Sequence, residues 1–175
     1  MNALLALVND SDFRLSGRVR GWTPPRWFRL WMRGATRVAD RWLWPALALV
    51  LGAAGQSGRE ALLAGAAAAL VANALLVLLK RRVKRRRPCE EAPHPLFLDL
   101  KPPDPFSFPS GHSMNAFAVG TVLALQFPAG APAFALLAGS IAASRVVLGM
   151  HYVSDVIVGS TLGVLLGGAA FALLV

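Results

Sequence analysis

Charged residues are scarce in this chain. They make up 15% of its 175 residues, whereas hydrophobic residues make up 55% and the mean hydropathy is +0.53. Soluble domains carry about 25% charged residues, so this composition excludes an ordinary soluble globule and indicates one domain that lies in a membrane. Cys89 is the only cysteine, which excludes a disulfide within the chain and a cysteine-rich metal site.

Acidic residues are the scarcer of the two charged classes. Nine Asp and Glu stand against 18 Lys and Arg, which gives a formal net charge of +9. In a soluble protein this excess would favour nucleic acid as the partner, because clustered cations release counterions from phosphate backbones. In an apolar chain, anionic lipid is the better partner, and we expect no binding of nucleic acid.

Five apolar stretches approach the roughly 20 residues that a helix needs to cross a bilayer. They run from Trp42 to Ala54, Ala61 to Leu79, Met114 to Phe127, Ala131 to Met150 and Tyr152 to Val175, and the first and third need flanking residues to span. We therefore expect residues 42–175 to form an all-α, polytopic membrane bundle of about five transmembrane helices in a bacterial inner membrane. The apolar run at 1–8 is too short for a signal peptide, so we expect no cleaved targeting segment.

A different pattern precedes the first apolar stretch, within residues 1–41. Arginines recur every four residues beside a neighbouring stripe of tryptophans and one valine. The arginines are Arg29, Arg33, Arg37 and Arg41, and the stripe is Trp27, Trp31, Val38 and Trp42. This periodicity predicts an amphipathic interfacial helix whose guanidinium groups face lipid phosphates, and we expect no catalytic residue in it. A helix packed on the protein with solvated arginines is the alternative.

A run of basic residues follows the second apolar stretch. Its first residue, Lys80, and its last, Arg87, are seven positions apart, which is two helical turns, and Pro88 ends the run. The two cations are expected to converge on one anion, Lys80 as a point charge and Arg87 as a bidentate fork. A topology or lipid-surface signal is the alternative for a basic run at a membrane boundary.

The sequence Pro109-Ser110-Gly111-His112 immediately precedes the third apolar stretch. At a helix start, the backbone N–H groups of Ser110 and Gly111 favour an anion. Beside that anion, His112 can donate a proton to a leaving oxygen and later accept one from water, because imidazole titrates near neutrality. A turn that only caps the helix is the alternative.

The third cluster contains Ser144, Arg145, His151 and Asp155. His151 and Asp155 are four residues apart, so on a helix they would share a face. The carboxylate could then accept a hydrogen bond from one imidazole nitrogen while the other nitrogen attacks. A carboxylate in an apolar segment is expensive unless it is paired, which favours function over the alternative of a structural polar pair.

Together the three clusters resemble the signature of the type 2 phosphatidic acid phosphatase superfamily. That signature is a lysine, six residues and Arg-Pro; then Pro-Ser-Gly-His; then Ser-Arg, five residues, His, three residues and Asp. All three parts match without a substitution and in order, from Lys80 to Asp155. Members commonly have six membrane helices, one more than the five apolar stretches of this chain.

The resemblance implies a phosphohistidine mechanism that needs no metal and no other cofactor. His151 would be the nucleophile, Asp155 would orient it and stabilise its imidazolium, and His112 would be the acid and base. The phosphoryl oxygens would be held by Lys80, Arg87, Arg145, Ser110 and the Gly111 amide. Three surrounding cations would also disfavour a divalent metal at the two histidines.

The expected reaction is hydrolysis of a lipid phosphomonoester or diphosphate whose tail stays in the hydrocarbon. Phosphatidic acid, phosphatidylglycerol phosphate, polyprenyl diphosphate and decaprenylphosphoryl phosphoribose all remain open as substrates, as does the oligomeric state. Haloperoxidases share the signature through vanadate, but those relatives are soluble. The rival interpretation is a non-catalytic membrane protein that binds anionic headgroups through the same cations, which would have no use for His151 and Asp155.

The order of the helices puts all three clusters on one membrane face. Every Lys and Arg except Arg59 falls on that face. The positive-inside rule therefore favours a cytoplasmic active site, although some of these cations are needed for phosphate and many relatives work on the other side.

Overall fold

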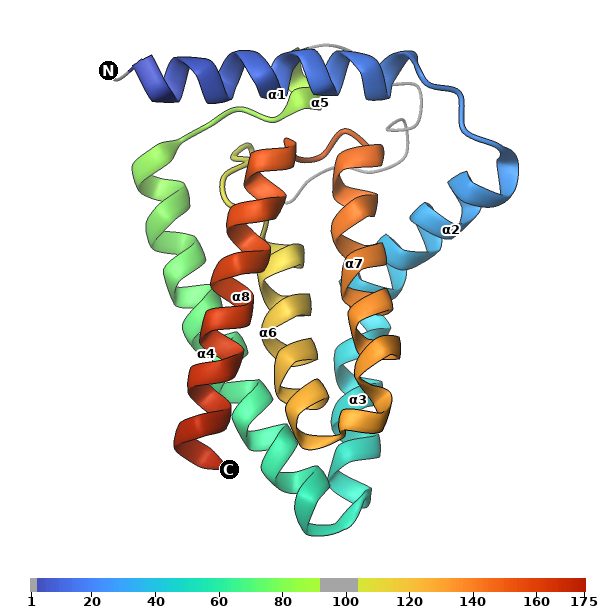
Figure 1. Ribbon diagram of the computed structural model, residues 1–175, viewed down its shortest axis with the longest axis vertical. Helices are drawn as coiled ribbons and strands as arrows, with labels where there is room; N and C mark the ends of the chain where they lie inside the picture. The colour runs from blue at the N-terminus through green and yellow to red at the C-terminus, as the bar shows by residue number, and fades with distance from the viewer. Residues whose placement is uncertain (1–2, 92–103) are drawn as a thin grey trace.

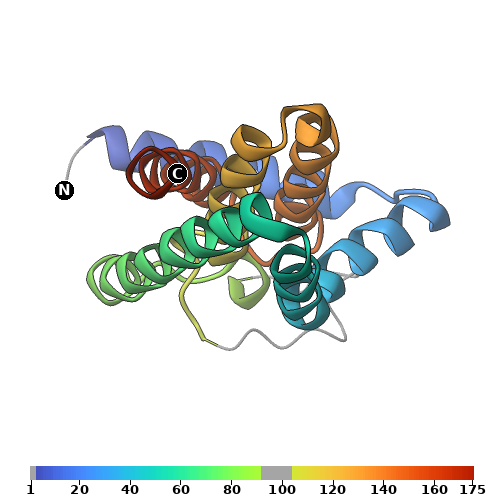
Figure 2. The same ribbon diagram turned by 90° about the horizontal axis from the view of Figure 1, so that it is seen from below.

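The computed structural model describes residues 3–91 and 104–175, and within them every regular element is helical. The elements are α1 (Ala3–Gly21), α2 (Arg26–Arg37), a π-helical turn (Val38–Trp42), α3 (Leu43–Ala53), α4 (Gly55–Val83), α5 (Pro88–Glu91), α6 (Gly111–Gln126), a 3-10 turn (Pro128–Gly130), α7 (Ala131–Val147) and α8 (Val153–Leu174). In Figure 1, α4, α6, α7 and α8 form a bundle, and α1 lies across one end of it. In the view from below, α6 lies among α4, α7 and α8 and packs against all three (Figure 2). The predicted all-α fold is confirmed for the described residues.

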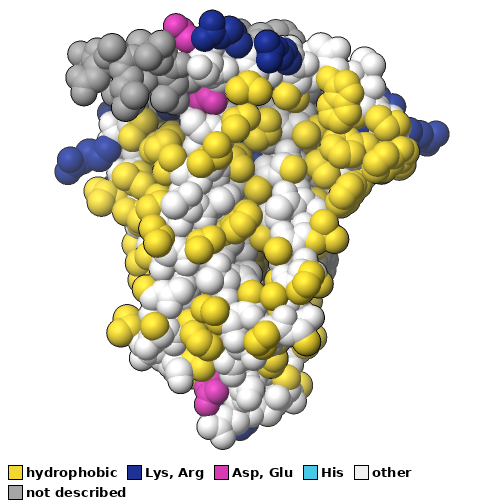
Figure 3. All heavy atoms as spheres, viewed as in Figure 1, with side chains coloured by type: hydrophobic (Ala, Val, Ile, Leu, Met, Phe, Trp, Pro, Cys, Tyr) yellow, Lys and Arg dark blue, Asp and Glu magenta, His cyan; other side chains and the backbone are white. Residues whose placement is uncertain are grey.

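Within residues 3–91 and 104–175, three helical segments are long and apolar enough to cross a membrane. They are Gly55–Val83, Pro128–Val147 and Val153–Leu174. Their outer faces carry large exposed hydrophobic side chains such as Leu70 and Leu165, which would be unfavourable in water and suit a lipid environment. Figure 3 shows hydrophobic side chains over the body of the bundle, while most Lys and Arg lie toward the α1 end. The chain is therefore a helical membrane protein.

The first and third apolar stretches form shorter helices than the other three. α3 has 11 residues and α6 has 16. α3 is extended at its start, because the π-helical turn joins it to α2 without leaving helical backbone angles at Arg37 or Leu43. The expected boundary between residues 41 and 42 thus falls inside a continuous helical stretch.

The amphipathic pattern before the first apolar stretch forms α2 and the π-helical turn. Met32 and Thr36 on α2 are buried, whereas Trp27 is 64% and Trp31 is 45% exposed. The buried side of α2 packs against α7. Helix α1 has no counterpart among the predicted elements.

A stripe of glycines allows α8 to touch the backbone of α6. Gly159, Gly163 and Gly167 are buried at intervals of four residues. A Cβ atom at these glycines would lie 2.6, 2.3 and 2.3 Å from the carbonyl oxygens of Ser110, Met114 and Ala118. Such small-residue stripes are a common way for membrane helices to approach closely. The contact at Ser110 fixes the start of α6 beside the start of α8, where two of the predicted clusters lie.

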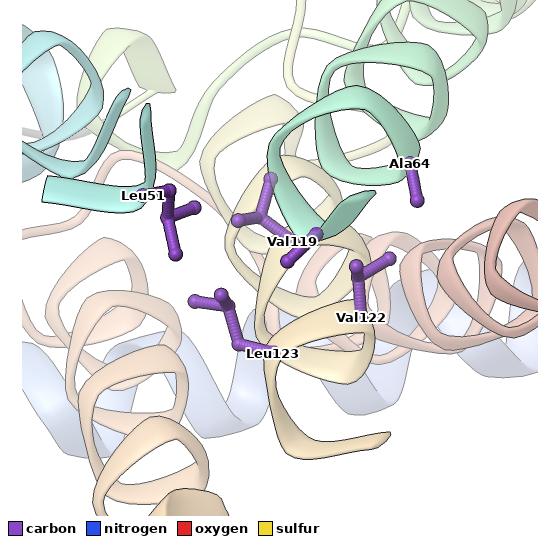
Figure 4. Close-up of a cluster of buried hydrophobic side chains, with 6 residues drawn as sticks. Leu51, Ala64, Val119, Val122 and Leu123 are labelled. Carbon is purple, nitrogen blue, oxygen red and sulfur yellow. The ribbon is translucent and has the colours of Figure 1, made fainter. Parts of the chain in front are cut away.

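An apolar cluster joins α3, α4 and α6 further along the bundle. Its buried members are Leu51, Ala61, Ala64, Val119, Val122 and Leu123, and all of them except Ala61 are labelled in Figure 4. All are less than 10% exposed, so these three helices are held together below the predicted site.

Candidate active site

His151 lies in the turn between α7 and α8, and not on a helix as its spacing from Asp155 predicted. α7 ends at Val147, Gly149 has a φ of 70°, and α8 begins only at Val153. The backbone N–H of His151 donates to the carbonyl oxygen of Arg145 at 3.1 Å, which ties the turn to the end of α7. The His151 side chain is only 2% exposed.

The hydrogen bonds of the His151 ring define its tautomer. Nδ1 is 2.6 Å from the backbone oxygen of Ser107, and a carbonyl oxygen can only accept, so Nδ1 carries the proton. Nε2 then has a free lone pair, which accepts from Nη1 of Arg87 at 3.1 Å. Burial lowers the pKa of His151 to about 4, so the ring is neutral at physiological pH.

Asp155 is close to His151 but does not share a hydrogen bond with it. Its Oδ2 is 3.6 Å from Nδ1, too far for the predicted hydrogen bond, and the carbonyl oxygen of Ser107 accepts the hydrogen bond from Nδ1–H. Instead Oδ2 accepts from the backbone N–H of Tyr152 at 2.9 Å, and Oδ1 accepts from Nη1 of Arg85 at 2.8 Å. At this distance the interaction between Asp155 and His151 is one of charge and not a hydrogen bond.

Lys80 and Arg87 converge as predicted, although not from one helical face. α4 ends at Val83, and Lys84 follows in the left-handed region with a φ of 50°, so Arg87 lies beyond the helix. Both cations meet at Asp104. Its Oδ2 is 2.7 Å from Nζ of Lys80 and 3.4 Å from Nη2 of Arg87. Burial alone would raise the pKa of Asp104, but the hydrogen bond and charge of Lys80 hold that pKa below its usual value.

Arg145 is a buried cation with an unsatisfied donor. It is 2% exposed, and its two terminal nitrogens donate to Oγ1 of Thr36 at 3.3 Å and to Sδ of Met150 at 3.5 Å. Its Nε has no hydrogen-bond partner among the described residues. A buried charge that lacks a full set of partners is costly, so this arrangement favours the binding of an anion.

A short chain of hydroxyl groups holds Arg145 in place. Ser144 donates from its Oγ to the carbonyl oxygen of Ile141 at 2.6 Å, so it can accept from Thr36, whose Oγ1 is 2.7 Å away. The same oxygen of Thr36 then accepts from Arg145. Thr36 lies on α2, so the N-terminal segment takes part in positioning this cation.

His112 is the second residue of α6, and its Nε2 is hydrogen-bonded to Oδ1 of Asp40. Asp40 comes from the π-helical turn between α2 and α3. We expected no catalytic residue in the amphipathic segment before residue 42. Asp40 and Thr36 of this segment nevertheless contact His112 and Arg145.

Most of the predicted site residues surround one cavity of about 610 Å³. Lys80, Arg87, Gly111, His112, Arg145 and His151 line it together with Asp40 and Asp104. Two predicted residues do not line it. Asp155 lies behind His151. Ser110 caps α6, where its Oγ accepts from the N–H of Ser113 at 3.4 Å and from the hydroxyl of Ser113 at 2.9 Å.

Among the described residues no group of three or more His, Cys, Asp or Glu is arranged to hold a metal ion. His94, the third histidine of the chain, lies outside the described residues.

Sequence reasoning missed Asp40, Thr36, Asp104, Ser107 and Arg85. Arg85 is one of seven basic residues between Lys80 and Arg87, and nothing in the sequence separates it from the others. Asp40 lies within the amphipathic pattern, which predicts a helix at the surface and gives no reason to place this carboxylate in the site. Asp104 lies among prolines in a polar loop, where a lone carboxylate carries no signal.

Comparisons with known proteins agree with this fold. A family model described as the PAP2 superfamily matches residues 61–175. A decaprenylphosphoryl-5-phosphoribose phosphatase of Mycolicibacterium smegmatis is 40% identical over 117 residues, which cover 66% of this chain and 62% of the relative. The protein of the same name in Mycobacterium tuberculosis is 38% identical over 136 residues, covering 77% of this chain and 74% of the relative.

The fold also matches a solved membrane structure. This is the crystal structure of the first transmembrane PAP2 type phosphatidylglycerolphosphate phosphatase from Bacillus subtilis, with a TM-score of 0.74 and 28% identity over 95% of this chain and 86% of the other. The chain belongs to the PAP2 superfamily, which confirms the resemblance read from its three clusters. The chain spans less than two thirds of the length of the Mycolicibacterium smegmatis relative.

Proposed function

We propose that this chain is an integral-membrane, metal-independent phosphatase that removes a phosphate group from a lipid phosphomonoester or diphosphate. The observation that carries the proposal is that Lys80, Arg87 and Arg145 line one cavity with the neutral ring of His151. These cations offset the charge of a phosphoryl group and of its transition state, and His151 supplies the lone pair that attacks. The phosphatases with which the chain aligns carry names that fit this activity.

In the first step, Nε2 of His151 attacks phosphorus in line with the leaving oxygen. The N–P bond forms as the P–O bond to the lipid breaks, and protonated His112 gives its proton to the departing oxygen. The ring of His151 becomes cationic because Nδ1 keeps its proton. The carbonyl of Ser107 and the charge of Asp155 at 3.6 Å stabilise that cation.

In the second step, His112 is neutral and accepts a proton from water. The resulting hydroxide attacks phosphorus, the N–P bond breaks, and the electron pair returns to Nε2 of His151. Asp40 stabilises His112 in its protonated form and so prepares it for the next cycle.

Phosphate binding requires an exchange of partners. Lys80 and Arg87 exchange the carboxylate of Asp104 for phosphoryl oxygens, and Nη1 of Arg87 leaves Nε2 of His151, which becomes free to attack. The amide of Gly111 at the start of α6 adds a hydrogen-bond donor where the helix dipole favours an anion. Direct contact between Ser110 and phosphate stays a prediction, since the Ser110 hydroxyl caps α6.

A lipid substrate is favoured by the shape of the cavity. Beyond its polar end, the cavity continues between α3, α4 and α6, where Leu51, Ala61, Gly65 and Ala69 line it. The 19 positions along α4 from Lys80 to Ala61 correspond to about 28 Å of helix, enough for a long hydrocarbon chain. The names of the mycobacterial relatives make a polyprenyl-linked phosphate the leading candidate.

We also infer that α3, α4, α6, α7 and α8 all cross a bacterial inner membrane, as one unit over residues 42–175. The exposed tryptophans of α2 would lie at the headgroups, with its arginines facing anionic lipid. The charge distribution favours a cytoplasmic active site. Arg82→Cys and Ser57→Cys, each in a Cys89→Ser background, mark the two ends of α4, and labelling of Arg82→Cys from outside intact cells would contradict this orientation.

The proposal is tested with purified wild type and His151→Asn on a panel of lipid phosphates in the presence of a metal chelator. We expect wild type to release phosphate from at least one lipid and His151→Asn to release none. Equal release by both proteins would contradict the mechanism. Binding of anionic vesicles without phosphate release by wild type would support the non-catalytic alternative instead.

A further inference from the structure

Arg85 turns away from the cavity and binds the far side of Asp155. Its Nη1 is 2.8 Å from Oδ1 of Asp155 and 2.8 Å from Oγ of Ser154. Its Nη2 is 2.8 Å from Oδ2 of Asp12. One guanidinium therefore bridges the carboxylate beside His151 and a carboxylate of α1.

Asp12 is held in this position by more than Arg85. It is 4% exposed although it belongs to a helix that lies across the end of the bundle. Its Oδ1 accepts from the backbone N–H of Ser154 at 3.2 Å, and its Oδ2 accepts from the Ser154 hydroxyl. The next residue, Phe13, packs on Tyr152 with ring centroids 5.6 Å apart. Helix α1 is thus docked on the first turn of α8.

The charges of this cluster do not cancel. Asp12 and Asp155 are two carboxylates around the single guanidinium of Arg85. An isolated pair of Arg85 and Asp155 would be neutral and would do little for a cation beside it. With Asp12 sharing Arg85, a net negative charge remains next to Nδ1 of His151, where the ring becomes positive upon phosphorylation.

We propose that Asp12 and Arg85 are positioning residues for the phosphoryl transfer, through which helix α1 holds Asp155 in place and keeps its negative charge available to His151. This inference rests on the proposed function, since it needs a cationic His151 intermediate. It makes the N-terminal helix α1 part of the working enzyme.

The variants Asp12→Asn and Arg85→Lys test this proposal in the full-length protein. Asn keeps the shape of Asp12 but removes its charge, and Lys keeps the charge of Arg85 but lacks the fork that spans two carboxylates. For both variants we expect kcat to fall by roughly tenfold with KM nearly unchanged, because the lost interaction strengthens only in the transition state. Asp12→Glu should restore part of the loss, and Asp10→Asn, at an exposed position of the same helix, should not change kcat.

Failure of the proposed function can be distinguished from failure of the role of Asp12 and Arg85. If wild type forms no phosphohistidine in rapid-quench experiments, the proposed function fails. If wild type forms it and Asp12→Asn and Arg85→Lys form it equally fast, with wild-type kcat, the role of Asp12 and Arg85 is overturned. A rise in KM at unchanged kcat, or an equal loss in Asp10→Asn, would also overturn it.

Discussion

Nδ1 of His151 and the backbone oxygen of Ser107 lie 2.6 Å apart. In serine hydrolases with a catalytic triad, a carboxylate accepts a hydrogen bond from the corresponding N–H of the histidine. Here a carbonyl oxygen accepts this hydrogen bond, and Asp155 lies 3.6 Å from the ring nitrogen. The tautomer is thereby fixed by the loop before α6, while the charge that complements the ring comes from α8.

The protonation state of His151 follows from this contact and from its burial. We expect His151 to stay neutral with its proton on Nδ1 as the pH falls from neutrality, and to protonate only near pH 4, below the usual value of about 6.5. Nitrogen-15 NMR of histidine-labelled protein measures both properties. The chain has three histidines, and His94→Gln and His112→Gln assign the signals. A midpoint near 6.5, or a proton on Nε2, would contradict this account.

Replacement of Asp40 should affect mainly the departure of the leaving group. Asp40→Asn removes a negative charge that favours the protonated form of His112, so we expect kcat for an alkyl lipid phosphate to fall on the order of tenfold, less than the ~10²–10⁴-fold that a general acid contributes. An aryl phosphate with a good leaving group serves as the internal control and should lose much less. Equal losses for both substrates would argue against a role for Asp40 in proton transfer.

Replacement of Asp104 should strengthen anion binding. This carboxylate pairs with Lys80 and Arg87, so a bound phosphate would have to compete with it for both cations. In Asp104→Asn we expect inhibition by inorganic phosphate to become roughly tenfold stronger, and Tm without phosphate to fall because two cations lose a partner. Added phosphate should raise Tm more in the variant than in wild type. Weaker inhibition in Asp104→Asn would mean that Asp104 helps to bind phosphate.

The apolar end of the cavity should discriminate by chain length. Gly65→Leu and Ala69→Leu place larger side chains among its lining residues, so we expect KM for a long-chain lipid phosphate to rise about tenfold. A water-soluble short-chain phosphate should be hydrolysed almost as before. Gly168→Leu on α8, which lies outside the cavity and has open space beside it, is the matched control. Similar losses on both substrates would place the lipid tail elsewhere.

The spacing of residues close in sequence predicted much of the site, and contacts between distant segments could not be predicted in this way. The spacing of His151 and Asp155 in the sequence predicted that they lie close together, although the turn at Gly149 places His151 outside the helix. Asp40 and His112 are 72 positions apart, and their contact depends on how the π-helical turn packs against α6. The same holds for Asp12 and Arg85, which are brought together only when α1 docks on α8.

The most direct test of the central claim is detection of the phosphoryl group on His151. In His112→Ala, loss of the base should slow attack by water, so an aryl phosphate should leave a base-stable, acid-labile phosphohistidine that peptide mass spectrometry assigns to position 151. The double variant His112→Ala with His151→Asn should carry none. A phosphoryl group on another residue, or phosphate release by His151→Asn at the wild-type rate, would contradict the account.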